Sequence, residues 1–318
     1  MLKILANDGV HPTGIKLLED AGHTVITEKI AQDDLPNQLP NFDVILVRSA
    51  TKVRKDLIDQ CPNLKLIGRG GVGLDNIDVD YAKSKGIHVI NTPAASSRAV
   101  AELTFGHMLS LARFLHVSNR KMPVSGNSEF GKLKKSFAKG FQISGKKLGI
   151  IGFGRIGQET AKLGIGIGMH VLPVDPYIAK ATLDLNFPNN PSQNLQMEIA
   201  SVPMETMLAE ADILSIHVPF AGGQPIIGAK EMDKMKEGVV IVNAARGGVV
   251  DEQALLTNLE SGKIKAAALD VFVGEPVPNQ ALLDHPQISV SPHIGAATAE
   301  AQENIGIELA SQITDLLG

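Results

Sequence analysis

Three side chains late in the sequence have the types needed for acid–base chemistry on a small carboxylic acid. Arg246 follows the apolar run VIVNAA, Glu275 comes after ALDVFVG, and His293 follows SVSP. An imidazole titrates near pH ~6.5, so it can exchange a proton with a substrate hydroxyl. A carboxylate can hold its other ring nitrogen, and an arginine can bind a substrate carboxylate and polarise the C2 oxygen. Together these groups suit hydride removal from a 2-hydroxy acid, or its reverse.

The spacings between these three residues, 29 and 18 positions, mean that only the fold can bring them together. Each follows a predicted strand, and open α/β sheets bind ligands at the carboxyl ends of their strands. Taken singly, each has an ordinary alternative: Arg246 could pair with a surface acid, Glu275 could be a solvated loop residue, and His293 a loop histidine. Their placement at one predicted sheet edge favours the catalytic interpretation.

A glycine-rich segment upstream has the pattern of a dinucleotide-binding loop. Gly152, Gly154 and Gly157 form G-x-G-x-x-G directly after an apolar strand and at the start of a helical pattern. There Gly152 permits a tight turn, Gly154 lets a pyrophosphate approach, and Gly157 lets the helix pack close to the strand. The amides of Arg155 and Ile156 are the expected phosphate donors. The alternative is a plain strand–helix turn.

Asp175 predicts which dinucleotide binds. It closes the next predicted strand, 18 residues beyond Gly157, close to the ~20 expected of the acidic residue that binds the adenine ribose. A carboxylate there accepts hydrogen bonds from the ribose hydroxyls and repels a 2′-phosphate. No arginine stands nearby in the sequence, although Lys180 is close. We therefore predict NAD in preference to NADP.

Short apolar runs alternate with helical patterns through most of the chain, which is typical of parallel sheets covered by helices. Strands are predicted at 3–8, 23–27, 43–49, 64–70 and 87–92, and then at 147–152, 169–175, 213–219, 239–245, 264–272 and 287–292. The second series has the six strands of a full dinucleotide-binding sheet. We also expect a long helix over 96–120, an amphipathic helix over 299–317 and a polar surface loop over 183–196.

These patterns predict an α/β protein with two doubly wound parallel-sheet domains. A Rossmann NAD-binding domain (96–295) is inserted into a flavodoxin-like substrate-binding domain (1–95 and 296–318). The last helix returns to pack on the first domain, and we expect a cleft with hinge closure between the domains.

The composition argues against several other classes of protein. A formal net charge of -4 disfavours a general nucleic-acid or anionic-membrane surface, and the absence of tryptophan disfavours single-strand stacking. The single cysteine, Cys61, rules out a disulfide within the chain and disfavours a cysteine-based zinc site, so no metal is expected. No run approaches ~18 apolar residues and no signal-peptide pattern opens the chain, so we expect a cytoplasmic protein.

Several motifs resemble the signatures of the D-isomer-specific 2-hydroxyacid dehydrogenases, over nearly the whole chain. They are VIVNAARGGVVDEQAL, AALDVFVGEP, SPHIGAAT and the glycine loop. The segment GRGGVGLDNIDVDYAKSKGIHVINTPAASSRAVAELT most resembles 3-phosphoglycerate dehydrogenases. The resemblance implies hydride transfer between NAD and C2 of a D-2-hydroxy acid, with D-3-phosphoglycerate and 3-phosphohydroxypyruvate of serine biosynthesis as the expected pair.

The resemblance also implies roles for individual residues. Arg246, Glu275 and His293 match the family's catalytic residues. Besides the glycine loop and Asp175, the positions that match the surroundings of the cofactor are Val72, His217, Val218, Pro219, Ala244, Asp270 and Gly295. The positions that match the substrate site are Arg48, Ser49, Gly70 and Gly71, together with Arg246 and His293. The family member that oxidises formate has Gln in place of Glu275, so formate is disfavoured.

Lys135, in the basic segment FGKLKKSFAKGF, is a candidate for the 3-phosphate. It matches a basic residue that reaches the neighbouring subunit's active site in phosphoglycerate dehydrogenases, although lysine is a point charge where their arginine is bidentate. The alternative is a solvated basic loop. The family also forms two-fold dimers through the long helix and the loop after it, so we expect a homodimer through 96–140. Because the chain ends at Gly318, we expect no C-terminal sensing domain.

Two other functions remain open. The same residues would serve a reductase of glyoxylate, hydroxypyruvate or another 2-oxo acid. A different class is an NAD(H)-sensing binding protein, like family members that act as transcriptional co-repressors. The presence of Arg246, Glu275 and His293 together favours turnover.

Overall fold

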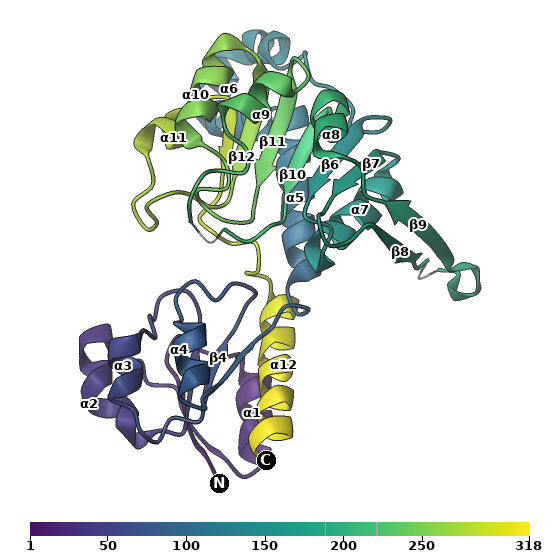
Figure 1. Ribbon diagram of the computed structural model, residues 1–318. Coiled ribbons are helices and arrows are strands. Elements are labelled where there is room, and N and C mark those ends of the chain that lie inside the picture. The colour runs from purple at the N-terminus through teal and green to yellow at the C-terminus, as the bar shows by residue number, and fades with distance from the viewer. Residues whose placement is uncertain (188, 221) are drawn as a thin grey trace. The chain divides into compact units, whose positions relative to one another are not determined.

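The computed structural model describes residues 1–187, 189–220 and 222–318, which form two compact units (Figure 1). The first unit comprises residues 1–99 and 296–318, and the second comprises residues 100–295. Each unit contains its own parallel sheet, so the α/β class predicted from the alternating strands and helices is confirmed.

The sheet of the first unit has the strand order β2-β1-β3-β4-β5, with all neighbours parallel. The strands are β1 (Lys3–Ala6), β2 (Thr24–Ile26), β3 (Val44–Val47), β4 (Leu66–Arg69) and β5 (His88–Asn91). The helices are α1 (Pro12–Asp20), α2 (Leu35–Gln38), α3 (Lys55–Asp59), α4 (Val79–Ser84) and α12 (Ala299–Leu317). Ile4 packs toward α1 and α12, whereas Leu5 packs toward α2, α3 and α4. Burial on both faces explains the unbroken apolar runs in these strands.

The last helix lies against α1, as predicted (Figure 1). Two glycines make the contact close: a Cβ added at Gly14 would lie 2.6 Å from the backbone of Gly306. On the sheet side, Ile305, Leu309 and Ile313 of α12 are buried. The end of the chain therefore completes the core that its first strand begins.

The sheet of the second unit has the order β13-β12-β11-β10-β6-β7, again parallel throughout. Its strands are β6 (Lys147–Ile151), β7 (His170–Val174), β10 (Ile213–Ile216), β11 (Val239–Asn243), β12 (Ile264–Leu269) and β13 (Ile288–Val290). The six predicted strands are thus all present. The order of the strands reverses beside β6: β7 follows on one side of it, and β10 to β13 follow on the other. Doubly wound sheets bind ligands at this reversal point.

Helices cover both faces of this second sheet. They are α5 (Ser97–Ala112), α6 (Leu115–Ser136), α7 (Arg155–Ile167), α8 (Met204–Glu210), α9 (Ala229–Lys234), α10 (Glu252–Ser261) and α11 (Gln280–Asp284). One apolar cluster joins the sheet to α5 and α7, and the other joins it to α8, α9, α10 and α11.

The single helix expected over 96–120 is wrong, because it breaks at Phe114. This residue has a φ of 57° and separates α5 from α6. The carbonyl of Ala112 accepts a hydrogen bond from the Phe141 amide at 3.0 Å, and the amide of His116 donates to Ser110 Oγ at 3.1 Å. These bonds replace the helical ones, and no glycine or proline marks the break in the sequence.

The surface loop expected over 183–196 is wrong at its two ends, while the described residues between 186 and 194 do lie outside the strands; Pro188 lies outside the described residues. Strands β8 (Lys180–Leu185) and β9 (Leu195–Ala200) form an antiparallel hairpin here, with a 3₁₀ turn at Pro191–Gln193. Leu183 is fully buried in the cluster on α7. The polar composition of the segment concealed its alternation of apolar and polar residues, which is the pattern of a half-buried strand.

We expect Gly14→Ala to destabilise the first unit. The new Cβ would meet the Gly306 backbone at 2.6 Å, so the two helices must separate, at a cost of about 1–3 kcal/mol. Urea unfolding measures the loss. Gly166→Ala in α7 is the control, because its added Cβ meets nothing within 4 Å and the helix gains about 0.5–1 kcal/mol in propensity. Equal effects of the two substitutions would contradict this packing argument.

Candidate functional site

The glycine loop connects β6 to α7 with the geometry that a dinucleotide requires. Gly152 has a φ of +90°, and a Cβ there would lie 2.5 Å from the His217 carbonyl oxygen. At Gly157 a Cβ would lie 2.0 Å from the Gly152 oxygen, so helix and strand could not pack this closely with any other residue. At Gly154 an added Cβ meets nothing within 4 Å. Because the first amides of α7, including Arg155, have no helical acceptor, this open side fits a pyrophosphate.

Asp175 follows β7 and is tied to the glycine loop. Its Oδ2 accepts a hydrogen bond from the Phe153 amide at 2.8 Å, and its Oδ1 accepts from the amides of Tyr177 and Ile178 at 2.8 and 3.0 Å. These bonds hold the carboxylate at the end of the strand, half-buried beside the loop. Lys180, the one cation near it in sequence, is paired with Glu198 at 2.8 Å, which weakens it as a partner for a 2′-phosphate.

The end of β10 closes the other side of the glycine loop through His217, Val218 and Pro219. Val218 Cγ1 would lie 2.7 Å from a Cβ at Gly152. The His217 ring is buried, and its Nε2 lies 2.8 Å from Ser215 Oγ and 3.1 Å from Thr160 Oγ1 on α7. Burial lowers the pKa of His217 to about 3. This histidine therefore stays neutral and joins β10 to the helix that the glycine loop begins.

Arg246 lies in a turn after β11 whose backbone is fixed by Asn243. The Asn243 side chain donates to the Arg246 carbonyl at 2.9 Å and accepts from the Ala245 amide at 3.0 Å, bridging Ala244. The guanidinium donates to the Ala245 carbonyl at 2.6 Å. The next residue, Gly247, packs on the turn after β12 so closely that a Cβ would lie 2.0 Å from the Phe272 oxygen. The arginine turn and the turn that leads to Glu275 are therefore in contact.

Glu275 and His293 meet directly. Glu275 Oε2 lies 2.8 Å from His293 Nδ1, and Glu275 Oε1 accepts from the Phe272 amide at 2.8 Å. Glu252 accepts from the following amide, that of Val273, at 2.7 Å. Burial, and to a smaller extent the charges of Asp251 and Glu275, raise the pKa of Glu252. Glu275 and Glu252 thus hold two successive amides of the turn after β12, and this turn places the Glu275 carboxylate beside the imidazole.

The backbone around His293 is held by Asp270. His293 has a φ of 54°, a conformation that residues other than glycine rarely adopt. Its amide donates to the Asp270 carbonyl at 2.8 Å, while the Asp270 carboxylate accepts from the amides of Ile294 and Gly295, each at 2.9 Å. Asp270 is 1% exposed. It acts on the loop from within the core.

A hollow of about 380 Å³ borders the Glu275–His293 pair within the second unit. Apart from these two side chains, most of its lining is apolar, including Phe272, Pro276 and Leu283.

In the first unit, Arg48 and Ser49 follow β3 in a loop held by two polar side chains. Asp8 Oδ2 accepts from the amides of Arg48 and Thr51 at 2.7 and 3.0 Å. Asn76 Nδ2 donates to the carbonyls of the same two residues at 2.7 and 2.6 Å. The loop is therefore fixed at both ends, and its position at the carboxyl edge of the sheet is set by the core.

Gly70, Gly71 and Val72 follow β4, also at the carboxyl edge of the first sheet. Gly71 has a φ of +141°, and a Cβ there would lie 2.5 Å from Arg69 Nη1. Its amide donates to Thr92 Oγ1 at 2.8 Å. Val72 is 37% exposed, and its carbonyl accepts from the Asn91 side chain at 2.7 Å. Most of the predicted site residues thus lie at or just after strand ends in the two units, and the side chains of Glu275 and His293 bond each other directly.

Lys135 lies near the end of α6 and is exposed. It belongs to the second unit. Of its basic neighbours, Lys132 is paired with Glu129 at 3.0 Å. Within the described residues, Lys135 is therefore placed on the surface, remote in sequence from the other predicted site residues.

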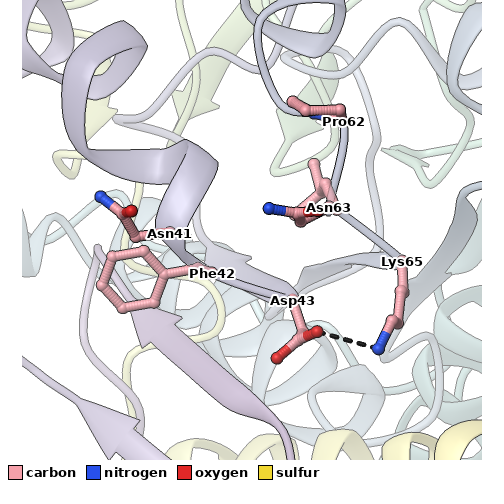
Figure 2. A pocket seen from close by; sticks show the side chains of 7 residues that line it. Asn41, Phe42, Asp43, Pro62, Asn63 and Lys65 are labelled. Atoms are coloured by element: carbon pink, nitrogen blue, oxygen red, sulfur yellow. Dashed lines mark ion pairs between the residues drawn. The ribbon is translucent and has the colours of Figure 1, made fainter.

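Not every hollow lies at the carboxyl edge. Figure 2 shows one of about 320 Å³ at the opposite edge of the first sheet, where β3 and β4 begin. Its charged residues, Asp43 and Lys65, bond each other at 2.9 Å. Asp43 also accepts from the Lys3 amide at 2.8 Å, which explains why its pKa is lowered. These contacts serve the packing of the strand ends.

Among residues 1–187, 189–220 and 222–318, no three histidine, cysteine or acidic side chains group as metal ligands. In the same residues, no helix has the length and apolarity to cross a bilayer.

Several residues that hold the site were not predicted from the sequence. Asp8 and Asn76 fix the Arg48 loop, Asn243 fixes Arg246, and Ser291 reaches Asp270. The available signal was their position, since Asp8, Asn243 and Ser291 stand at or just after the end of an apolar strand. Asn76 gave no such signal, because its loop becomes adjacent to Arg48 only in the folded sheet.

Comparisons with known proteins agree with this geometry. The model of a family described as D-isomer specific 2-hydroxyacid dehydrogenase, NAD binding domain, matches residues 105–295. The chain is 43% identical over 321 residues to hydroxypyruvate reductase of Thermotoga maritima, covering 99% of this chain and 98% of that protein. It is 40% identical over 318 residues to D-3-phosphoglycerate dehydrogenase of Methanocaldococcus jannaschii, covering all of this chain but only 58% of that protein.

A solved structure resembles the whole chain. It is that of D-lactate dehydrogenase from Aquifex aeolicus in complex with NAD and lactic acid, with a TM-score of 0.76 and 28% identity. The match covers 98% of this chain and 94% of that one.

We expect acid to destabilise the second unit through His217. Its pKa is about 3 in the folded protein and about 6.5 when unfolded. The unfolded chain therefore binds the extra proton as the pH falls below ~6.5, and stability drops by about 1.4 kcal/mol per pH unit toward pH ~3. Urea unfolding at pH 6.5 and 5.0 measures this slope. It should become shallower in His217→Gln and remain unchanged in the exposed control His88→Gln; the same slope in all three proteins would refute the assignment.

Proposed function

The chain belongs to the family of D-isomer specific 2-hydroxyacid dehydrogenases, which use NAD, and from this premise we propose that Arg246, Glu275 and His293 are its catalytic residues. The observation that carries the proposal is the hydrogen bond of 2.8 Å between Glu275 Oε2 and His293 Nδ1. A carboxylate only accepts, so Nδ1 carries the proton and Nε2 is left to exchange one with a substrate.

In the oxidising direction, His293 Nε2 takes the proton of the C2 hydroxyl. The imidazolium that forms is stabilised by Glu275, whose other oxygen is held by the Phe272 amide. When bound, NAD accepts the hydride from C2, and NADH supplies it in the reverse direction. In reduction, His293 returns its proton to the oxygen of the former carbonyl.

Arg246 binds the substrate carboxylate and polarises the C2 oxygen. Because Asn243 holds the Arg246 backbone, the guanidinium extends from a fixed position. In the first unit, Arg48 and Ser49 are proposed to bind the same carboxylate, with Gly70 and Gly71 leaving room for the substrate. Val72, His217, Val218, Pro219, Ala244, Asp270 and Gly295 are proposed to surround the cofactor, whose phosphates lie on the glycine loop and whose ribose lies on Asp175.

The proposed substrate pair is D-3-phosphoglycerate and 3-phosphohydroxypyruvate. The resemblance of residues 68–104 and the similarity to D-3-phosphoglycerate dehydrogenase support it. Hydroxypyruvate is the second candidate, because the relative that the chain matches from end to end is named a hydroxypyruvate reductase. The two pairs differ only in the 3-phosphate, so cations that could bind this group decide between them.

We propose that Lys135 supplies one such cation to a second subunit. Arg69 is 9% exposed and already has a partner, and Lys132 is paired with Glu129. Lys134 and Lys135 are both exposed, and of these two Lys135 matches the basic residue of phosphoglycerate dehydrogenases. The helix that carries it exposes apolar side chains, with Leu115 53%, Val124 85% and Phe130 60% exposed. A two-fold interface through 96–140 would cover them.

A substrate panel tests the proposed reaction. With NADH, we expect kcat/KM for 3-phosphohydroxypyruvate to exceed that for hydroxypyruvate, glyoxylate and pyruvate by at least about tenfold, or about 1.4 kcal/mol of transition-state binding.

Glu275→Gln keeps the shape of the side chain and removes its charge, so kcat should fall about 100-fold. A preference for hydroxypyruvate would assign the second candidate. NADH binding without turnover of any 2-oxo acid would favour a sensor.

Lys135→Ala tests the role of that lysine in phosphate binding. We expect KM for 3-phosphohydroxypyruvate to rise about tenfold, with kcat and the KM for hydroxypyruvate unchanged, because only the phosphate loses a partner. Lys121→Ala, another exposed lysine of α6, is the control. Unaltered KM values, or a monomer in sedimentation of the wild-type protein, would exclude a contribution across subunits.

A further inference from the structure

A buried histidine joins helix α5 to the strand that leads to His293. His107 is 6% exposed, and both of its ring nitrogens have partners. Nδ1 lies 2.9 Å from Ser289 Oγ on β13, and Nε2 lies 2.8 Å from Ser291 Oγ, just beyond the end of that strand. One side chain thus bridges two serines whose side chains lie on the same face of the strand.

The chain of hydrogen bonds continues from Ser291 to the loop around His293. Ser291 Oγ donates to Asp270 Oδ1 at 2.5 Å. The same carboxylate accepts from the amides of Ile294 and Gly295, and the Asp270 carbonyl accepts from the His293 amide. His107 is therefore two hydrogen bonds away from the carboxylate that fixes the residues after His293.

The direction of each bond follows from the carboxylate at its end. Asp270 only accepts, so Ser291 must donate to it, and the Ser291 oxygen is then free to accept from Nε2–H of His107. In a neutral ring Nδ1 then has no proton and accepts from Ser289. Burial lowers the pKa of His107, which favours this neutral form. The network is thus complete in one tautomer and one charge state.

We propose that His107 is a positioning residue for His293: through Ser291 it aligns Asp270, which holds His293 in the backbone conformation that faces Glu275. This inference rests on the proposed catalytic role of His293. A left-handed conformation at a residue other than glycine costs about 1–2 kcal/mol, so the surrounding hydrogen bonds must maintain it. Without the Nε2 donor, Ser291 is free to turn from Asp270, and the loop loses one of its restraints.

The test compares His107→Leu, which removes both bonds, with His107→Gln, whose amide nitrogen can reach Ser291 in place of Nε2. We expect His107→Leu to lower kcat about tenfold or more, because a small displacement of the reacting group is costly. The NADH dissociation constant should rise by a smaller factor than kcat falls, because Asp270 and Gly295, proposed to lie beside the cofactor, keep their bonds to each other. His107→Gln should recover most of kcat. If His107 only filled space in the core, His107→Gln would not recover kcat.

A second readout does not depend on turnover. Hydrogen–deuterium exchange at the amides of Ile294 and Gly295 should accelerate in His107→Leu and stay near the wild-type rate in His107→Gln. His170→Leu is the control, since that exposed ring lies at the start of β7, at the opposite edge of the sheet from β13. It should leave both kcat and the exchange of these two amides unchanged.

Three outcomes would overturn the inference: wild-type kcat and exchange in His107→Leu, exchange raised throughout the protein, or a loss of kcat that His107→Gln does not reduce. If His107→Leu does not fold, Ser291→Ala breaks the same network at its middle and must give the same loss. If the wild-type protein reduces no 2-oxo acid, the proposed function fails. The exchange experiment then still decides whether His107 holds the loop.

Discussion

The chemistry proposed for the second unit depends on a single directional constraint, the acceptance of the His293 Nδ1 proton by Glu275. A histidine in solution interconverts between tautomers, but a fixed carboxylate at one nitrogen leaves the other as the only reactive position. Every neighbouring turn contributes to that pairing. Phe272 holds the glutamate, Asp270 holds the backbone on both sides of the imidazole, and the Arg246 turn packs on the same segment through Gly247. Stability and reactivity are therefore built from the same contacts.

A feature of the fold or the site could be predicted from the sequence where the residues that determine it lie close together along the chain. The order of the strands and the strand–turn–helix conformation of the glycine loop were predicted correctly, because a G-x-G-x-x-G pattern after an apolar strand has few alternative structures. The break at Phe114 was not predictable, since its cause is a bond from Phe141, far along the chain, to the end of α5. The role of His107 was hidden for a similar reason: its partners come from β13, and in the sequence it is one polar residue among the apolar side chains of a helix. Both features depend on contacts between residues far apart in the sequence, and the amino-acid composition does not reveal such contacts.

The two units use the same device at their carboxyl edges. In each, a loop that follows a strand is held by polar side chains that bond its backbone: Asp8 and Asn76 hold the Arg48 loop, and Asp270 holds the His293 loop. Because these bonds go to the backbone, they do not engage the Arg48 guanidinium or Nε2 of His293. The backbone of each loop is therefore fixed by groups other than those proposed to meet a ligand.

The hairpin formed by β8 and β9 has a consequence for how this sequence can vary. Its strands bond each other and take no part in the parallel sheet, and its cross-strand pairs, such as Lys180 with Glu198, are exposed. Leu183 is buried in the cluster on α7, and Ala181 and Ile199 pack against that cluster more partially. Length and residue type can therefore change between the two strands without shifting the register of any strand that carries the site. The hairpin is a segment in which related sequences can diverge, or a peptide tag be inserted, at little cost to the rest of the molecule.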